Sequence, residues 1–229
     1  MAYLRPSCPA GGFLGLLDPR DCDDLVGLGR PRRYRPRTPI ILEGDRGDAV
    51  FFLLSGRVKV TVDTAEGREV VLALDGPGDA FGYFEAIERD LDSRTATVTT
   101  VEPVECLTLT GDQFRAFLDT HPGVLPVLLR WVSLRLRAAD QRRVEFASLD
   151  VPHRLARFIL EMAEGHGRPD QNAIDVDIPL TQDELASLIS ASRDSVVRVL
   201  TSLRARGLVT TARRKLAITD LDGLRRFAG

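Results

Sequence analysis

The sequence predicts an α+β protein with an N-terminal β jelly-roll barrel, a long dimerisation helix and a C-terminal winged helix-turn-helix domain. Three observations predict this class. Short apolar runs alternate with glycine turns from about residue 34 to 109, a heptad pattern of apolar residues follows, and two closely spaced helices precede a basic hairpin. We place the domains at residues 12–120, 121–149 and 150–229.

Length and composition agree with this organisation. The 229 residues are enough for two ordinary domains, and 44% hydrophobic with 28% charged residues is typical of a globular protein. A net charge of −2 does not by itself indicate a nucleic-acid or membrane partner, although a local basic patch acts within a Debye length. No window approaches the roughly 20 apolar residues of a spanning helix, and the first residues do not resemble a signal peptide. We therefore expect a cytoplasmic protein.

The three cysteines, Cys8, Cys22 and Cys106, are far apart, odd in number and without a CxxC pair. A disulfide framework and a zinc site are not expected from this pattern, and an iron–sulfur cluster needs four clustered thiolates. We expect three ordinary thiols in a reducing compartment, and no metal site.

Residues 34–109 have the pattern of short β-strands. The stretch "RVKVTVD" alternates polar and apolar residues, as a half-buried strand does. Glycines recur roughly every ten residues, which is the spacing of turns in a barrel or jelly roll. These are Gly44, Gly47, Gly56, Gly67, Gly76, Gly78 and Gly82.

Helices follow the barrel. Thr110 can cap a helix that stops at Pro122, and residues 122–150 predict one long helix. Its apolar residues are spaced four and three apart, and this seam is interrupted at Arg143. The seam consists of Leu125, Leu129, Val132, Leu136, Ala139 and Phe146. We interpret it as a homodimer contact, since the opposite face is rich in arginine; the alternative is that it packs on its own barrel.

The C-terminal region contains a helix-turn-helix pattern. Residues 153–167 predict an amphipathic helix and residues 168–180 a polar connector with one short strand. Thr181, with Glu184 three residues later, predicts a capping box for a helix that buries Leu185, Leu188 and Ile189. Ser192 caps the next helix. We expect Val196, Val197, Leu200 and Leu203 to point inward, leaving Arg193, Ser195 and Arg198 outside.

This outer face has the chemistry of a major-groove reader. Arginine can pair with guanine O6 and N7, and serine can reach a base edge or a phosphate. Gln182 begins a helix and is placed for a phosphate oxygen. Residues 208–219 predict a wing of two strands whose turn carries Arg213, Arg214 and Lys215. The alternative is a two-helix packing unit with a solvated basic face, but seven basic residues against one acid between residues 193 and 215 favour DNA.

These segments together carry a family resemblance. "LDVPHRLARFILEMA" and "LTQDELASLISASRDSVVRVLTSLRARGLV" resemble the winged helix of the Crp/Fnr family of bacterial transcription regulators. "EGDRGDAVFFLLSGRVKV" and "SRTATV" resemble the cyclic-nucleotide-binding barrel of that family. The resemblance implies that Arg193, Asp194 and Arg198 face base edges and that Ser192 lies near a phosphate. It also implies a homodimer on double-stranded DNA, with RNA polymerase as a partner and no membrane.

The resemblance also implies an effector site in the stretch "GDAFGYFEAIERDLDSRTATV", from Gly78 to Val98. The family's cassette has Phe-Gly-Glu, whose glutamate holds the ribose, and then an arginine and a hydroxyl for the cyclic phosphate. Here Tyr83 follows Phe81 and Gly82, and Glu85 precedes Arg94 and Thr95. Either Glu85 takes the ribose role or it is a surface carboxylate.

The effector therefore stays open at this stage. Cyclic AMP, another cyclic nucleotide or another anion fits the resemblance, and Arg94 in a buried salt bridge to Glu85 or Asp79 is the alternative. On the long helix, Ala138 and Ala139 stand where family members that respond to cyclic AMP place a hydroxyl for the purine, so Ala139 is a weak candidate contact.

Three functions follow as hypotheses. The first is a DNA-binding regulator with an effector, and its variant is an effector-independent regulator with a degenerate pocket. The second is a ligand-binding module that acts through protein contacts. The third, an enzyme, is not expected, because the sequence shows no paired carboxylates, triad spacing, Walker loop or metal-ligand set. Haem is disfavoured, since His121, His153 and His166 lie outside the barrel segment.

Overall fold

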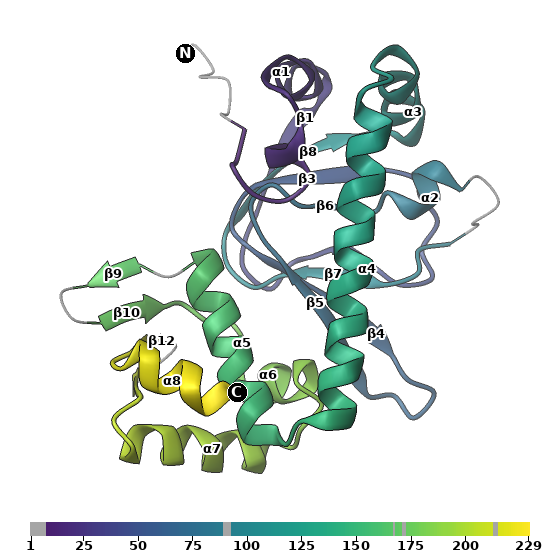
Figure 1. The fold of residues 1–229 in the computed structure, drawn as a ribbon. Helices are drawn as coiled ribbons and strands as arrows, with labels where there is room; N and C mark the ends of the chain where they lie inside the picture. The colour runs from purple at the N-terminus through teal and green to yellow at the C-terminus, as the bar shows by residue number, and fades with distance from the viewer. Residues whose placement is uncertain (1–7, 89–92, 167, 171–172, 213–214) are drawn as a thin grey trace. The chain divides into compact units, whose positions relative to one another are not determined.

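The computed structural model describes residues 8–88, 93–166, 168–170, 173–212 and 215–229 (Figure 1). The chain forms two compact units, Met1–Arg137 and Ala138–Gly229, and each is described by itself. Among the described residues, no helix has the length and apolarity needed to span a membrane.

The first unit is a β barrel with short helices around it, as the sequence predicted. One sheet has the strand order β1-β8-β3-β6 and the other β2-β7-β4-β5, and all pairs are antiparallel. The strands are β1 (Arg30–Tyr34), β2 (Pro39–Ile41), β3 (Val50–Ser55), β4 (Val58–Asp63), β5 (Glu69–Asp75), β6 (Ala80–Phe81), β7 (Thr97–Thr100) and β8 (Val104–Leu109). The helices are η1 (Leu14–Leu16), α1 (Pro19–Leu28), α2 (Phe84–Ile87), α3 (Gly111–Thr120) and α4 (Val124–Ser148), which continues into the second unit.

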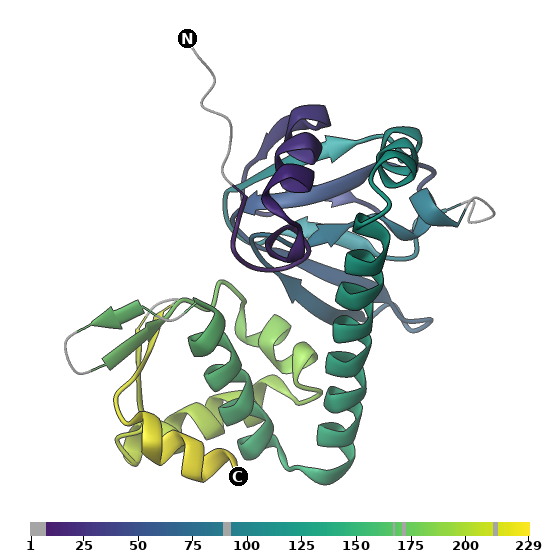
Figure 2. The same cartoon turned by 45° about the horizontal axis from the view of Figure 1, so that its top comes forward.

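Strand β3 shows how the sequence builds two apolar layers. Its side chains alternate between the two faces of the sheet because the strand period is two residues. Phe51 and Leu53 enter the barrel interior, where they meet residues of both sheets. Val50 and Phe52 point to the other face, which α1, α3 and α4 cover. Figures 1 and 2 show α1 and the first turns of α4 beside this sheet.

Helix α3 begins and ends where the sequence predicted. Thr110 accepts a hydrogen bond from the Gln113 backbone N–H, and the Gln113 side chain accepts one from the Thr110 N–H, which makes a full capping box. The helix ends at Thr120, just before Pro122.

The long helix α4 presents two different faces. Val124, Leu128 and Trp131 are buried against the barrel core. Of the predicted seam, Val132 packs against the same core, whereas Leu129 and Leu136 expose 61% and 59% of their surface. The alternative that the seam packs on its own barrel is therefore wrong for these leucines.

The segment before the barrel was not predicted to form a helix. Asp18 caps α1 by accepting hydrogen bonds from the backbone N–H groups of Arg20 and Asp21, and Pro19 occupies the first helical position. The expectation of three free thiols is wrong, because Cys8 and Cys22 form a disulfide. Sequence spacing could not show this pair, since the chain between them folds back on the barrel and brings their Cα atoms to 6.5 Å.

In its described residues, the second unit contains the end of α4, four further helices and one antiparallel sheet of order β11-β12-β10-β9. Its helices are α5 (Val151–His166), α6 (Gln182–Leu188), α7 (Arg193–Ala205) and α8 (Leu221–Ala228). Its strands are β9 (Arg168–Asp170), β10 (Ala173–Val176), β11 (Val209–Ala212) and β12 (Lys215–Ile218). The connector holds two strands where one was predicted, and α8, which packs on α5, was not predicted.

Candidate functional site

Helix α6 is fixed at its start by the predicted capping box. The Thr181 hydroxyl accepts from the Glu184 backbone N–H at 3.2 Å, and the Glu184 carboxylate accepts from the Thr181 N–H at 2.7 Å. Leu185, Leu188 and Ile189 are buried, as predicted. Gln182 is exposed at the first helical position, beside a hollow of about 290 Å³ that lies between α6, α7 and β11. The free backbone N–H groups of a helix start favour an anion at such a place.

The turn between α6 and α7 is stabilised by a residue that the sequence analysis missed. Arg154 of α5 donates to the backbone oxygens of Ile189 and Ser190, both at 2.9 Å, and to that of Leu149 at 2.6 Å. Ser190 has a φ of 50°, which is uncommon for a residue other than glycine. One guanidinium thus ties the helix-turn-helix turn to α5, over 35 residues of sequence.

Replacing Arg154 with alanine is expected to loosen this turn. Hydrogen bonds from a charged donor are worth about 1.5–3 kcal/mol each, so Arg154→Ala should lower the free energy of unfolding by at least that amount. We expect DNA affinity, measured by fluorescence anisotropy, to fall at least tenfold because α7 is no longer held in place. Arg157→Ala is the matched control, since Arg157 bonds to Ala228, Gly229 and Glu145 and not to the turn. An equal loss of DNA affinity in both variants would contradict this role.

Helix α7 exposes the predicted DNA-contacting residues. Ser192 caps it by accepting from the Ser195 backbone N–H, and Arg193, Asp194 and Arg198 are exposed along its first turns. The Ser195 hydroxyl lies 2.9 Å from that of Ser192 and accepts from Arg198 at 3.0 Å. Two exposed guanidinium groups and one carboxylate therefore stand at the start of an exposed helix.

One prediction about the buried face of α7 is wrong. Val196 and Leu203 are fully buried as expected, but Val197 is 39% exposed and Val199 is buried in its place. A helix turns about 100° per residue, so positions 196, 199 and 203 share a face that position 197 cannot join.

The wing forms from β11 and β12, which pair from Val209 with Ile218 to Ala212 with Lys215. Arg204 of α7 donates to the Thr211 hydroxyl at 3.3 Å and so connects the recognition helix to the wing. The predicted contacts Arg213 and Arg214 lie outside the described residues, and Lys215 is described only as the first residue of β12.

A second hollow, of about 490 Å³, lies on the other flank of α7. Arg198, Ser202 and Arg206 line it, together with His153 from the first turn of α5. The Arg206 guanidinium lies 5.0 Å from the centre of the Phe227 ring, which stacks on His153. Both flanks of α7 thus carry hydroxyl and cationic groups, which is the chemistry of a surface for nucleic-acid phosphates.

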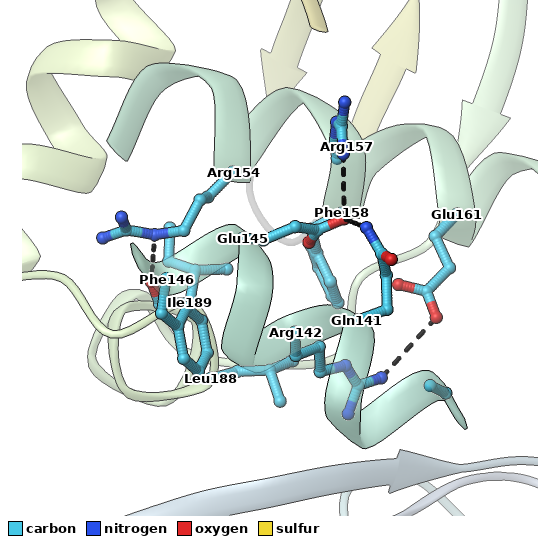
Figure 3. A pocket seen from close by; sticks show the side chains of 11 residues that line it. Gln141, Arg142, Glu145, Phe146, Arg154, Arg157, Phe158, Glu161, Leu188 and Ile189 are labelled. Carbon is cyan, nitrogen blue, oxygen red and sulfur yellow. Dashed lines mark hydrogen bonds and ion pairs between the residues drawn. The ribbon is translucent and has the colours of Figure 1, made fainter. Parts of the chain in front are cut away.

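A third cavity lies where the last turns of α4 meet α5 (Figure 3). It measures about 240 Å³, and four of its charged side chains point at one another in two pairs, while Arg154 points to the Ile189 oxygen. Glu145 accepts from Arg157 and Gln141, both at 3.1 Å, and Arg142 lies 3.5 Å from Glu161. The Arg157–Glu145 and Arg142–Glu161 pairs connect the end of α4 to α5.

In the barrel, the predicted effector residues do come together. Phe81, Gly82, Tyr83, Glu85, Arg94 and Thr95 all line one cavity. Arg94 donates to the Glu85 carboxylate at 2.8 Å and to the backbone oxygens of Gly82 and Ala49. The Thr95 backbone N–H donates to the other Glu85 oxygen at 3.2 Å. Glu85 and Arg94 each expose only 6% of their surface, so the hypothesis that Glu85 is a surface carboxylate is wrong.

A second ion pair, between half-buried Arg135 and buried Asp75, borders the same cavity, and the sequence analysis missed it. Arg135 of α4 donates to both oxygens of Asp75, at 2.8 and 3.3 Å. Nearby, Asp79 accepts from the Gly76 backbone N–H and from the Trp131 indole. Burial raises the pKa of Asp79, and the neighbouring Asp75 carboxylate raises it further.

The barrel cavity, as it stands, does not fit a cyclic nucleotide. Its volume is about 70 Å³, against the roughly 300 Å³ or more of ordinary ligand pockets. Both arginines that line it are ion-paired within the chain. Tyr83, at the position where the resemblance implies a glutamate, is buried against Trp131. Ala139 is exposed on α4 and is not among the residues that line the cavity.

Comparison with known proteins covers both units. Residues 31–121 match the family model of the cyclic nucleotide-binding domain, and residues 153–227 match that of the Crp-like helix-turn-helix domain. The chain is 32% identical over 219 residues to the CRP-like cAMP-activated global transcriptional regulator of Mycobacterium tuberculosis, with 96% of each chain covered. It is 29% identical to the cAMP-activated global transcriptional regulator Vfr of Pseudomonas aeruginosa, over 82% of this chain and 88% of that protein.

Solved structures agree on the fold. A CRP-family transcriptional regulator from Thermus thermophilus is 27% identical, with a TM-score of 0.74 over 86% of this chain and 96% of that one. The c-di-GMP responsive global regulator CLP of Xanthomonas campestris has a TM-score of 0.76 over 88% of this chain and 99% of that one. At 23% identity, the second likeness shows the fold alone.

Proposed function

This chain belongs to the Crp/Fnr family of transcription regulators, and we propose that it binds double-stranded DNA as a homodimer on a near-palindromic operator. The observation that carries the proposal is the start of α7. Arg193, Asp194 and Arg198 are exposed there, on a helix that Ser192 caps and that Arg154 positions through the preceding turn. Arginine selects guanine in the major groove, and a carboxylate accepts from cytosine N4. The family consists of regulators rather than enzymes.

The homodimer is supported by the exposed seam of α4. Leu125, Leu129 and Leu136 expose 49%, 61% and 59% of their surface, and their spacing of four and seven residues is that of a coiled-coil contact. A second copy of the same helix would remove these side chains from water. Two recognition helices would then reach successive major grooves about 34 Å apart.

Phosphate contacts would set the register of the complex. We assign Thr181, Gln182, Ser192 and Ser195 to this role at the starts of the two helices, and Arg213, Arg214 and Lys215 to it on the wing. The regulator would act in the cytoplasm, where bacterial DNA lies, and RNA polymerase would be its partner at promoters.

The first experiment selects binding sites from a pool of random DNA duplexes and then measures affinity against salt. We expect a near-palindromic motif with two half-sites about one helical turn apart. A dimer that contacts about six phosphates should lose roughly a thousandfold in affinity between 50 and 200 mM salt. No enriched motif together with a flat salt response would refute DNA binding and favour a module that acts through protein contacts.

The barrel cavity favours the effector-independent form of this function. Its two ion pairs, Glu85 with Arg94 and Asp75 with Arg135, already neutralise the cations that an anionic effector would need. Its small volume gives a nucleotide no room without rearrangement. Relatives in other bacteria are named as cAMP-activated, so cyclic AMP is the ligand to exclude first.

Calorimetric titration with cyclic AMP and with cyclic GMP tests this form. We expect no saturable heat from either nucleotide, while the selected DNA duplex binds with the same affinity in their presence. A phosphate could enter only if the ion pairs opened. Glu85→Gln should therefore leave the DNA affinity unchanged, both with and without cyclic nucleotide. Saturable binding that raises DNA affinity would show that the cavity opens into a working effector site.

A further inference from the structure

We propose that Cys8 and Cys22 form a reversible disulfide through which oxidants change the DNA affinity of this regulator. The inference rests on the proposed function for its DNA readout and on the structure for its site. Cys8 and Cys22 are joined in the barrel unit, while Cys106 is a free thiol.

The site has the geometry of a disulfide. The Cα atoms of Cys8 and Cys22 are 6.5 Å apart, inside the range of about 4.4–6.8 Å that disulfides span. Cys22 lies on α1, where it is 2% exposed, and Cys8 is half-buried in the segment before it. Cys8 is therefore the partner that solvent reaches.

The setting argues for a bond that opens and closes. A protein that binds bacterial DNA works among reducing thiols, and disulfides in such a compartment are mostly transient and redox-sensing. A peroxide would oxidise one thiol to a sulfenic acid with release of water. The second thiol would then displace a second water and close the disulfide. A dithiol would reverse the bond by exchange and become oxidised itself.

The third cysteine provides a contrast within the same unit. Cys106 is fully buried on β8, and burial raises its pKa to about 12. The thiolate is the reactive form, so Cys106 should stay reduced under conditions that oxidise the pair. Replacing it gives a variant that differs only at an inert thiol.

The closed loop contacts two parts of the barrel unit, helix α4 and the turn at Gly78. Phe13, between the two cysteines, is fully buried with its ring centre 5.8 Å from that of Trp131 on α4. Leu14 donates its backbone N–H to the Gly78 oxygen at 2.9 Å. The next residue, Asp79, accepts from the Trp131 indole. The loop therefore touches both α4 and the turn that leads into the barrel cavity.

The approach of these backbones is close enough to transmit a constraint. A Cβ on Gly78, whose φ is 94°, would lie within van der Waals overlap of the Gly11 oxygen, and one on Gly12 would overlap Gly78. The backbones of residues 11–12 and 78–79 are therefore in direct van der Waals contact. Closing the disulfide should hold residues 8–22 on this surface, and reduction should free them to move away from Trp131.

The test compares the full chain after hydrogen peroxide and after dithiothreitol. We expect one alkylatable thiol in the oxidised, denatured protein and three after reduction. The closed loop should raise Tm by about 5–10 °C, and the fluorescence of Trp131, the single tryptophan, should shift. The DNA affinities of the two forms should differ at least fivefold.

Single cysteine variants show which thiols are responsible for these differences. Cys8→Ser and Cys22→Ala should each abolish all four differences, and Cys106→Ser should keep them. Absence of the Cys8–Cys22 bond after oxidation, its resistance to dithiothreitol in the folded protein, or equal DNA affinity of both forms would overturn the proposal. If neither form binds DNA, the proposed function fails, and the thiol counts still report on the disulfide.

Discussion

Arg193→Ala is expected to remove about 1–3 kcal/mol of discrimination at a single base pair of the operator. Arg193 is the first residue of α7 and is exposed, so its guanidinium is free to pair with O6 and N7 of a guanine. The loss should appear as relaxed preference at one position in each half-site. Competition binding with a panel of singly substituted duplexes measures it directly.

Gln182→Ala provides the comparison for this variant. Gln182 lies at the start of α6, where a phosphate contact carries no base information. Its loss should weaken binding to every duplex of the panel by a similar factor. If Arg193→Ala also weakened all duplexes equally, Arg193 would be a phosphate contact and the assignment of base readout would fail.

Arg94→Met is expected to destabilise the barrel by about 3–5 kcal/mol, because it leaves the Glu85 carboxylate buried without its cation. Urea unfolding of the full chain, followed by the fluorescence of Trp131, measures this change. The double variant Glu85→Gln with Arg94→Met should recover much of the loss. Replacing both members of a buried pair removes the uncompensated charge that makes the single change costly.

An exposed ion pair supplies the control. Arg33 lies 3.2 Å from Glu105 on the surface, where its side chain is 78% exposed. Arg33→Met should therefore leave the stability almost unchanged, since solvent screens such pairs. Equal effects of Arg33→Met and Arg94→Met would mean that the Glu85–Arg94 pair does not stabilise the barrel.

Two arginines of this chain form hydrogen bonds to residues far away in sequence, which no local sequence pattern predicts. Arg135 meets Asp75 across 60 residues of sequence, and Arg154 reaches the turn at Ile189 across 35. The arginine-rich face of the long helix was visible in the sequence. Which of those arginines would turn inward depended on the elements that pack beside them.

The two helices that the sequence analysis missed, α1 and α8, both begin at residues typical of helix starts. Asp18 before Pro19 is a start signal for α1, and Asp220 caps α8 by accepting from the Gly223 backbone N–H. Both helices are short, with ten and eight residues, so each offers only about two to three turns of pattern. Packing on the barrel and on α5 stabilises them.

The sequence alone determined the succession of barrel, long helix and helix-turn-helix, the caps at Thr110, Thr181 and Ser192, and the exposed arginines of α7. These features depend on residues within three or four positions of one another, so local hydrogen bonds and periodicity decide them. Only the tertiary structure decided that Glu85 forms an ion pair with Arg94, that Asp75 forms one with Arg135, and that Cys8 forms a disulfide with Cys22. Each of these contacts forms between segments that meet only when the barrel closes. The packing of these segments therefore determines which group lies next to each charge or thiol.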